Sequence, residues 1–535
     1  MLRREFLQSM VGFMGASVAV LGEKARDKED HFKLAELTIP QLQRGMGEGK
    51  WTAVSLTKAY LKRIEKLDKN GPQVNSVIEV NPDAVEIARE LDRLRKKGNL
   101  RGPMHGIPVL IKDNIDTGDR MQTTAGSLAL EGTRALRDAF LVKRLREAGA
   151  VILGKTNLSE WANFRSYRST SGWSGRGGLT RNPYVLDRNT SGSSSGSGAA
   201  VAANFCAVAV GTETDGSIIS PSTYCGIVGL KPTVGLVSRS GIIPISKSQD
   251  TAGPMTRTVE DAAILLGAMA GVDSADEVTR GSAGKAEKDY TRFLDKDGLR
   301  GARIGVVRQM FGNRNERVAE EIEMAIALMK AAGAEVIDKV EMPSLRQMGD
   351  AEQQVLLYEF KAGIAEYLAT RGKDFRFKTL ADLIRFNDEN KDREMPYFGQ
   401  DTFLRSEKLG PLTEKAYLEA REKCVKLTRA EGIDAVMDEH RLDALMAPSG
   451  APAHRTDLIY GDRGTGGSSS AAAAAGYPNI TVPAGFVSGL PLGISFFGRA
   501  YSEPVLLKIA YGFEQATRVR RAPQFIQTVE DFEEG

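Results

Sequence analysis

Short apolar runs alternate with stretches of helical periodicity along this chain of 535 residues, and this alternation constrains the fold most strongly. The apolar runs are three to five residues long, and they lie at 107–111, 151–153, 206–210, 227–230, 235–237, 303–307, 335–337, 442–446 and 480–482. Such short runs without polar alternation are typical of strands that are covered on both faces. The stretches with apolar residues every three or four positions lie at 56–67, 84–94, 139–148 and 319–332. Strands that alternate with helices predict an α/β fold built on a sheet.

Sheet elements occur on both sides of a charged, helical stretch at 345–430, so we expect one large domain rather than several. This domain is expected to cover 32–530, with 345–430 as a helical insertion that lines a cleft. The net charge of +3 gives no reason to expect a nucleic acid or an anionic membrane as a partner. Three scattered cysteines without a C-x-x-C pair predict neither a disulfide framework nor a zinc site.

The first residues have the composition of an export signal. Arg3 and Arg4 precede an apolar run from Met10 to Gly22, which is too short to span a bilayer as an ordinary helix. Paired arginines before a short apolar run are typical of a twin-arginine signal. We therefore expect residues 1–25 to be a signal peptide, and the mature protein to be periplasmic or secreted without a membrane span. If the start is instead a frayed amphipathic helix, the protein is expected to be cytoplasmic.

Within a stretch rich in Gly and Ser at 171–198, the segment 191–198 allows three interpretations. It could be a flexible linker, but it runs directly into the apolar residues 199–210, where a linker would separate domains. Residues 192–196 also fit G-x-S-x-G, the nucleophile elbow of α/β-hydrolases, which needs a histidine later in the chain. Only His440 and His454 follow it. The third interpretation, a tight buried loop whose serine hydroxyls point into a site, fits glycines that lead into core elements best.

A lysine and two serines form the candidate catalytic set. A serine hydroxyl is a weak nucleophile until a base takes its proton, and no histidine lies close in sequence to Ser193 or Ser217. Lys112 ends the apolar run 107–111, and burial lowers the pKa of a lysine toward neutrality. In the turn that leads to Ser217, Gly216 allows consecutive backbone N–H groups to converge on one point, as an oxyanion hole requires.

Six segments together resemble the amidase signature family. They are HGIPVLIKDNID (105–116), VILGKTNLSEWA (151–162), SGSSSGSGAAVAA (191–203), the segment from GTETDGSI to GIIP (211–244), DTAGPMTRTVEDAA (250–263), and YPNITVPAGF with GLPLGISFFGR (477–499). The resemblance implies a mixed sheet flanked by helices on both faces and a Ser-cisSer-Lys triad. Transferred by motif position, Ser217 is the nucleophile, Ser193 the bridging serine and Lys112 the base.

The same resemblance implies an acyl-enzyme mechanism that needs no metal and no organic cofactor. The oxyanion hole is then formed by backbone N–H groups of Thr214, Asp215, Gly216 and Ser217. Three further residues are expected to support the triad: Ser194 within the proton relay, and Asp113 and Asn157 beside the lysine. The complete triad makes a catalytically inactive binding protein the less favoured interpretation.

Within the family, the chain is most similar to the peptide amidase branch. Asp215 stands where most members have the first glycine of GGS, and Ile219 stands where many have arginine, a ready partner for a substrate carboxylate. We therefore expect a small-molecule or short-peptide amide as substrate, and removal of C-terminal amides with release of ammonia. The acyl side of the cleft is expected to be apolar or neutral. An aryl- or fatty-acyl amide hydrolase on the same scaffold is the alternative, followed by a glutaminase-type amidotransferase subunit.

Overall fold

The computed structural model describes residues 32–312, 316–463 and 466–532. The chain divides into two compact units, Met1–Ala35 and Glu36–Gly535. The signal peptide predicted for 1–25 lies outside the described residues, and 32–35 are the described part of the first unit. None of the helices in the described ranges is long and apolar enough to cross a membrane. The fold is therefore that of the second unit.

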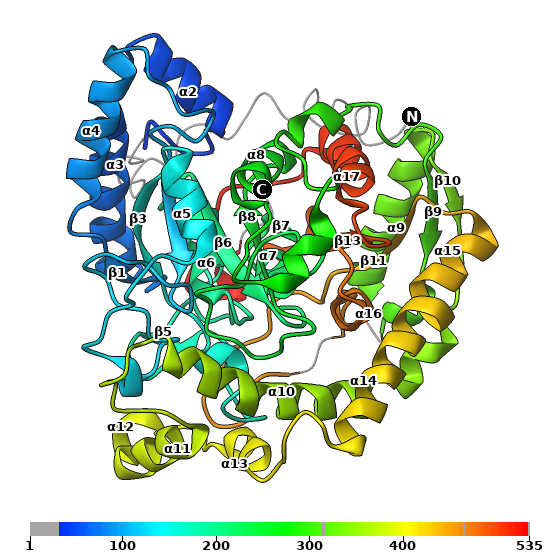
Figure 1. Cartoon of the computed structure of the whole chain (residues 1–535). Helices are drawn as coiled ribbons and strands as arrows, with labels where there is room; N and C mark the ends of the chain where they lie inside the picture. Colours follow the sequence, from blue (N-terminus) through cyan, green and yellow to red (C-terminus); the bar gives the residue numbers. More distant parts are fainter. Residues whose placement is uncertain (1–31, 313–315, 464–465, 533–535) are drawn as a thin grey trace. The chain divides into compact units, whose positions relative to one another are not determined.

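One mixed sheet with eleven strands, counted over the described residues, forms the centre of this unit (Figure 1). Its strands are β1 (Val77–Val80), β2 (Pro108–Lys112), β3 (Val151–Thr156), β6 (Val208–Glu213), β7 (Val228–Lys231), β8 (Thr251–Thr256), β9 (Arg303–Val306), β10 (Glu335–Ile337), β11 (Ala444–Pro448), β12 (Asn479–Val487) and β13 (Leu490–Phe497). The spatial order is β1-β3-β2-β6-β8-β7-β12-β13-β11-β9-β10. Neighbours are parallel within β3-β2-β6 and within β11-β9-β10, and antiparallel elsewhere. A separate ribbon pairs β4 (Trp173–Ser174) with β5 (Gly178–Leu179).

Helices flank the sheet on both faces, which confirms the expected α/β class. They are α2 (Ile39–Gly47), α3 (Ala53–Arg63), α4 (Ala84–Lys96), α5 (Phe140–Glu147), α6 (Ser195–Ala202), α7 (Ile219–Tyr224), α8 (Val259–Met269), α9 (Glu316–Ala331), α10 (Gly349–Ala369), α11 (Leu380–Glu389), α12 (Lys391–Glu394), α13 (Asp401–Glu407), α14 (Lys415–Thr428), α15 (Asp434–His440), α16 (Ser469–Ala475) and α17 (Glu503–Thr517). Every residue of β2, β3, β6 and β7 is buried. Cover on both faces explains why these strands read as continuous apolar runs without polar alternation.

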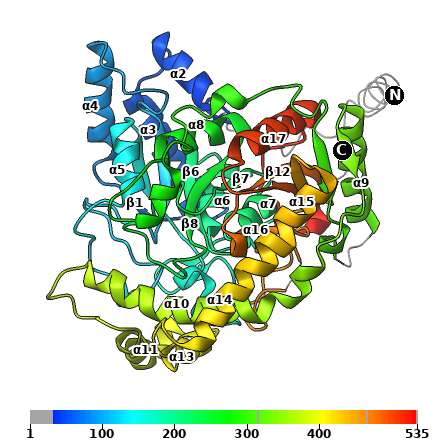
Figure 2. The same ribbon diagram turned by 45° about the vertical axis from the view of Figure 1, so that its right-hand side comes forward.

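The segment between β10 and β11 is mostly helical and begins with the long helix α10. In both views α10 lies below the central strands (Figures 1 and 2), and α14 packs against both α10 and α16. The inner face of α10 buries Phe360, whose ring lies 5.2 Å from that of Phe403 in α13. Phe403 in turn lies 5.7 Å from Trp161, so an aromatic cluster fixes α10 to the rest of the unit. This anchor determines where Glu366 and Tyr367, further along α10, are placed.

One sequence-based expectation about local structure was wrong, and three strands, β1, β8 and β13, were not predicted. The run at 235–237 is not a strand, because only an isolated bridge joins Val234 to Val237. Conversely, β8 was missed because Gly253 and Pro254 in its sequence are usual strand breakers. Gly253 is needed there, since a Cβ at this position would lie 2.0 Å from the carbonyl oxygen of Leu230 in β7. This glycine is thus required by the close approach of two strands and does not mark a turn.

Candidate active site

Two neighbouring parallel strands place the candidate base. Lys112 is the last residue of β2, and β6 runs beside it with Ile111 opposite Val210. The fully buried Lys112 donates through Nζ to Ser193 Oγ (2.8 Å) and to Thr212 Oγ1 (2.8 Å). Its Nζ also lies 3.3 Å from the carbonyl oxygen of Thr212. The amine is therefore held by β6 and pointed at the hydroxyl of Ser193.

Burial decides the protonation of this lysine. Removal from water lowers the pKa of Lys112 to about 7, although the negative charges of Glu213 and Asp250 act in the opposite direction. Near pH 7, Lys112 is therefore a neutral amine in a substantial fraction of the molecules. A neutral amine has a lone pair, so Nζ can accept the proton of Ser193 across the same 2.8 Å contact.

The two serines approach each other through their backbones. The peptide bond between Gly192 and Ser193 is cis, and Ser194 is the N-cap of α6. The N–H of Ser194 donates to the carbonyl oxygen of Ser217 (3.1 Å), which ties the serine-rich loop to the turn after β6. Both Ser193 and Ser217 line one cavity. Among the described residues, no hydrogen bond joins their two hydroxyl groups.

The turn that ends in Ser217 leaves several N–H groups unused. Gly216 adopts φ +79°, a conformation that favours glycine, and lets the chain reverse directly after β6. The carboxylate of Glu213 accepts the N–H groups of Ile218 (2.7 Å) and Ile219 (2.9 Å) and so fixes the start of α7. Within the described part of the chain, the N–H groups of Asp215, Gly216 and Ser217 donate to no other group. A turn with free donors next to a serine is suited to stabilise an oxyanion.

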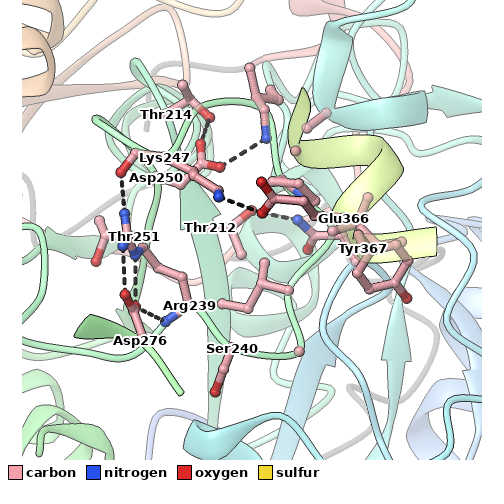
Figure 3. A pocket seen from close by; sticks show the side chains of 18 of the residues that line it. Thr212, Thr214, Arg239, Ser240, Lys247, Asp250, Thr251, Asp276, Glu366 and Tyr367 are labelled. Atoms are coloured by element: carbon pink, nitrogen blue, oxygen red, sulfur yellow. Dashed lines mark hydrogen bonds and ion pairs between the residues drawn. The ribbon is translucent and has the colours of Figure 1, made fainter. Parts of the chain in front are cut away.

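A cavity of about 560 Å³ opens in front of Ser193 and Ser217. Its apolar wall is the segment 242–245, and α10 supplies Glu366 and Tyr367 on another side (Figure 3). Charged side chains also line it, so the expectation of a neutral wall was wrong. Two ion pairs form among them, Arg239 with Asp276 (2.6 Å) and Lys247 with Glu366 (Figure 3), whereas Arg137 in the lining has no ion pair among the described residues. The acidic partners come from 273–300 and from α10, which carry no recognisable motif.

The supporting residues inferred from sequence have other partners. Asp113, in the turn directly after β2, accepts from Thr124, and its Oδ2 lies 3.5 Å from Arg176. The Asn157 amide donates to the carbonyl oxygen of Gly178 (3.0 Å) and to Thr180 Oγ1 (3.0 Å). Neither contacts the amine of Lys112, so the structure does not support the expected orienting role.

Ser194 likewise bonds outside the triad. Its hydroxyl donates to the carbonyl oxygen of Thr212 (3.0 Å) and accepts from the N–H of the same residue (3.2 Å). The residues that do hold the lysine are Thr212 and, behind it, Asn114, whose Nδ2 donates to Thr212 Oγ1 (3.0 Å). Asn114 lies inside the segment 105–116, but nothing in the sequence indicated that its side chain would bond to Thr212.

Histidine and metal chemistry have no counterpart in the described part of the cavity. The lining contains no histidine there, and His454 lies 3.2 Å from Tyr224 Oη instead. A nucleophile elbow at Ser194 would therefore have no base beside it. Among the described residues, no cluster of three or more His, Cys, Asp or Glu side chains could hold a metal ion. A lysine with two serines is what the cavity offers for acyl transfer.

The family model "Amidase" matches residues 55–507. This chain belongs to the amidase signature family, and it is an amide-hydrolysing enzyme.

Solved structures and curated relatives agree with this assignment. Native peptide amidase from Stenotrophomonas maltophilia is similar with a TM-score of 0.88 and 52% identity, over 92% of this chain and 99% of that one. An amidase family protein from Bacillus anthracis follows with a TM-score of 0.83 and 38% identity, over 92% and 93% of the two chains. A probable amidase of Arabidopsis thaliana is 43% identical over 92% of this chain and 93% of its own length. A glutamyl-tRNA(Gln) amidotransferase subunit from Thermoanaerobacter pseudethanolicus is 33% identical over 92% and 99%.

Proposed function

We propose that the enzyme hydrolyses amides through Lys112, Ser193 and Ser217, and that its substrates are short peptides with a C-terminal amide. The observation that carries the catalytic part is the 2.8 Å contact between the buried Lys112 amine and Ser193, beside a turn that presents Ser217. The substrate part rests on the likeness to the Stenotrophomonas peptide amidase and on the size and charge of the cavity.

In the proposed reaction, neutral Lys112 takes the proton of Ser193, which takes that of Ser217. The Ser217 oxygen attacks the amide carbonyl, and the free N–H groups of the turn stabilise the resulting oxyanion. Such donors contribute about 2.7–4 kcal/mol each to the transition state. Ser193 then returns a proton to the leaving ammonia as the C–N bond breaks. Water hydrolyses the Ser217 ester by the same relay in reverse.

Two of the three lining cations, Arg239 and Lys247, are paired, which favours a neutral acyl group over an acid, while Arg137 has no ion pair among the described residues. Arg239 is already satisfied by Asp276, so it offers no free partner to a substrate carboxylate. Ile219 stands where many members have arginine, so a second possible partner for a substrate carboxylate is absent. A primary amide requires only a small leaving-group pocket, whereas an internal peptide bond would need room for a continuing chain. Free-acid peptides and internal bonds are therefore expected to remain uncut.

A four-substrate panel tests this proposal. Ammonia release is measured from a C-terminally amidated dipeptide and from glutamine, product release from an anilide, and hydrolysis of oleamide. The dipeptide amide should give the highest kcat/KM. A preference for the anilide or oleamide would favour an aryl- or fatty-acyl amide hydrolase instead. A preference for glutamine would favour the amidotransferase activity of relatives such as that from Thermoanaerobacter.

Covalent labelling tests the nucleophile independently of the substrate. A fluorophosphonate probe followed by peptide mapping should modify Ser217. A label on Ser194 would revive the nucleophile elbow and reject the triad. Chymostatin, a competitive inhibitor of the related peptide amidase, should compete with the probe if the acyl groove is of the same kind.

We also propose that residues 1–25 direct export. The paired Arg3 and Arg4 before the apolar run 10–22 support this. Replacement of both arginines by lysine should retain the enzyme in the cytoplasm of a host with the twin-arginine pathway. Unchanged fractionation would contradict the proposal.

A further inference from the structure

Two carboxyl groups and one amide lie behind the turn that carries Ser217, away from the cavity. The Nε2 group of Gln249 donates both to the carbonyl oxygen of Thr214 (3.3 Å) and to Glu352 Oε1 (2.9 Å). Asp215 accepts from Ser470 through Oδ2 (2.7 Å). Its Oδ1 is buried and has no hydrogen-bond partner among the described residues. The helix α10 therefore reaches the back of the turn through Glu352 and Gln249.

The contact with Thr214 acts on a single peptide unit. The carbonyl of Thr214 and the N–H of Asp215 belong to the same planar group and point in opposite directions. A hydrogen bond from Gln249 to that carbonyl thus fixes the direction of the Asp215 N–H. This N–H is one of the donors that nothing else in the described part of the chain uses. Gln249, which is itself bonded to Glu352, therefore orients the N–H group of Asp215.

The surroundings of Glu352 favour a protonated carboxyl group. Burial and, to a smaller extent, the negative charge of Asp215 raise its pKa to about 8, against the hydrogen bond from Gln249, which acts in the opposite direction. The other titratable groups near the pair are Cys424 on α14, which faces Glu352, and two residues near Asp215, Lys231 on β7 and the buried Glu213 at the end of β6. The pKa of Lys231 is also lowered to about 8 by burial, so an experiment must separate the two groups. Two neighbouring carboxylates behind this turn would repel each other and would also repel the negative charge of the oxyanion.

We propose that Glu352, in its protonated form, is a positioning residue for the oxyanion turn, and that it keeps the pair with Asp215 at a single negative charge. This inference rests on the proposed role of the turn in amide hydrolysis. When Glu352 loses its proton, a second carboxylate appears behind the N–H donors and opposes the charge of the tetrahedral intermediate. Since that charge is absent in the bound substrate, kcat falls and KM changes little.

The test is the pH dependence of kcat and KM on the dipeptide amide and on the anilide, from about pH 5 to about pH 10. Wild-type kcat should rise as Lys112 loses its proton and fall again in the alkaline range. Glu352→Gln keeps a neutral side chain that still accepts from Gln249, so it should retain the rise and lose the alkaline fall. Glu359→Gln is the matched control. It removes another buried carboxyl group of α10, which bonds Ser248 and Tyr417, and should leave the alkaline fall in place.

A second variant covers the case in which Glu352→Gln does not fold, as judged by circular dichroism. Asp215→Asn removes the negative charge that helps to raise the pKa of Glu352, so the alkaline fall should move to lower pH. Gln249→Leu should lower kcat at every pH without a change in KM, because the peptide plane is then no longer held.

An unchanged alkaline fall in Glu352→Gln would assign it to another group, such as Lys231, and overturn the inference. An equal loss of kcat at all pH values in that variant would indicate a purely structural role and would overturn it as well. Failure of the proposed function looks different. An enzyme active on the anilide but on no peptide amide contradicts the substrate, while its pH profile still decides the role of Glu352. A wild-type enzyme inactive on both substrates overturns both proposals.

Discussion

The floor and the wall of the cavity are built in different ways. The floor consists of the ends of β2 and β6 and the two loops beside them, which carry Lys112, Thr212, Ser193 and Ser217. Its geometry follows from strand register and from backbone hydrogen bonds such as that from Ser194 to Ser217. The wall consists of α10 and of segments near Arg239 and Asp276, which meet through side-chain ion pairs. We therefore expect substitutions in the floor to act on kcat and substitutions in the wall to act on KM.

The largest effect is expected from Ser217→Ala. Loss of the nucleophile should lower kcat by about 10⁴-fold or more, while the melting temperature stays close to that of the wild type. Steady-state ammonia release and differential scanning calorimetry measure the two quantities. Residual activity near the wild-type level would mean that another group attacks the amide.

Lys112→Ala should lower kcat by about 10³-fold, the range of a lost general base. In the wild type, the neutral amine is needed, and its pKa of about 7 implies that activity rises as the pH increases through that value. The variant should have lost this rise. Replacement of His105, His440 and His454 together should leave kcat unchanged, and a loss of acylation there would argue for a histidine base.

The same lysine should reduce stability at low pH. Its pKa is about 7 in the folded protein and about 10.5 when unfolded, so the unfolded chain binds more protons between these values. The free energy of unfolding therefore increases with pH across that window, and the penalty is complete below it. Lys112→Met should flatten this dependence and be more stable than the wild type at pH values below 7. Urea titrations over this pH range measure it.

Thr212→Val tests the support of the base within the floor. The hydroxyl of Thr212 accepts from Lys112 Nζ, and removal of this acceptor disfavours the charged amine. The pKa of Lys112 should fall, and the rise of kcat should move to lower pH. The matched change Thr223→Val removes a buried hydroxyl group of α7 that donates to the carbonyl oxygen of Ile219 (2.9 Å) and not to the lysine or its charged neighbours, so it should leave that pH unchanged. A shift in both variants would show a general disturbance of the floor.

The smallest effect is expected in the wall. Glu366→Gln breaks the ion pair with Lys247, whose two side chains are about half exposed. Exposed pairs of this kind are worth about 0–1 kcal/mol, so KM should change by up to about five-fold and kcat should not. The change should shrink at high salt, where the pair is screened. If kcat falls by as much as KM changes, the proposed difference between floor and wall is contradicted.

Most of the floor could be predicted from the sequence because its residues lie in short segments with local constraints. The strand predicted at 107–111 positions Lys112 at its end, and Gly216 indicates a turn with a positive φ before Ser217. The α/β class followed from apolar runs whose continuity reflects cover on both faces. Gly253 shows the limit of such inference. A residue that breaks strands on average sits inside β8, since a neighbouring carbonyl leaves no space for a Cβ.

The tertiary structure alone decided what surrounds these residues. Asp113 and Asn157 were expected to support the lysine, yet the directions of their side chains give them other partners. Glu352 and Glu366 lie in a helix without a motif, and only the packing of Phe360 against Phe403 brings them to the turn and the cavity. The chemistry of a site can be recognised from adjacent residues, whereas burial and pairing depend on contacts between separate segments, such as Gln249 and Glu352, which are 103 residues apart. Their free energies cannot be read from either segment by itself.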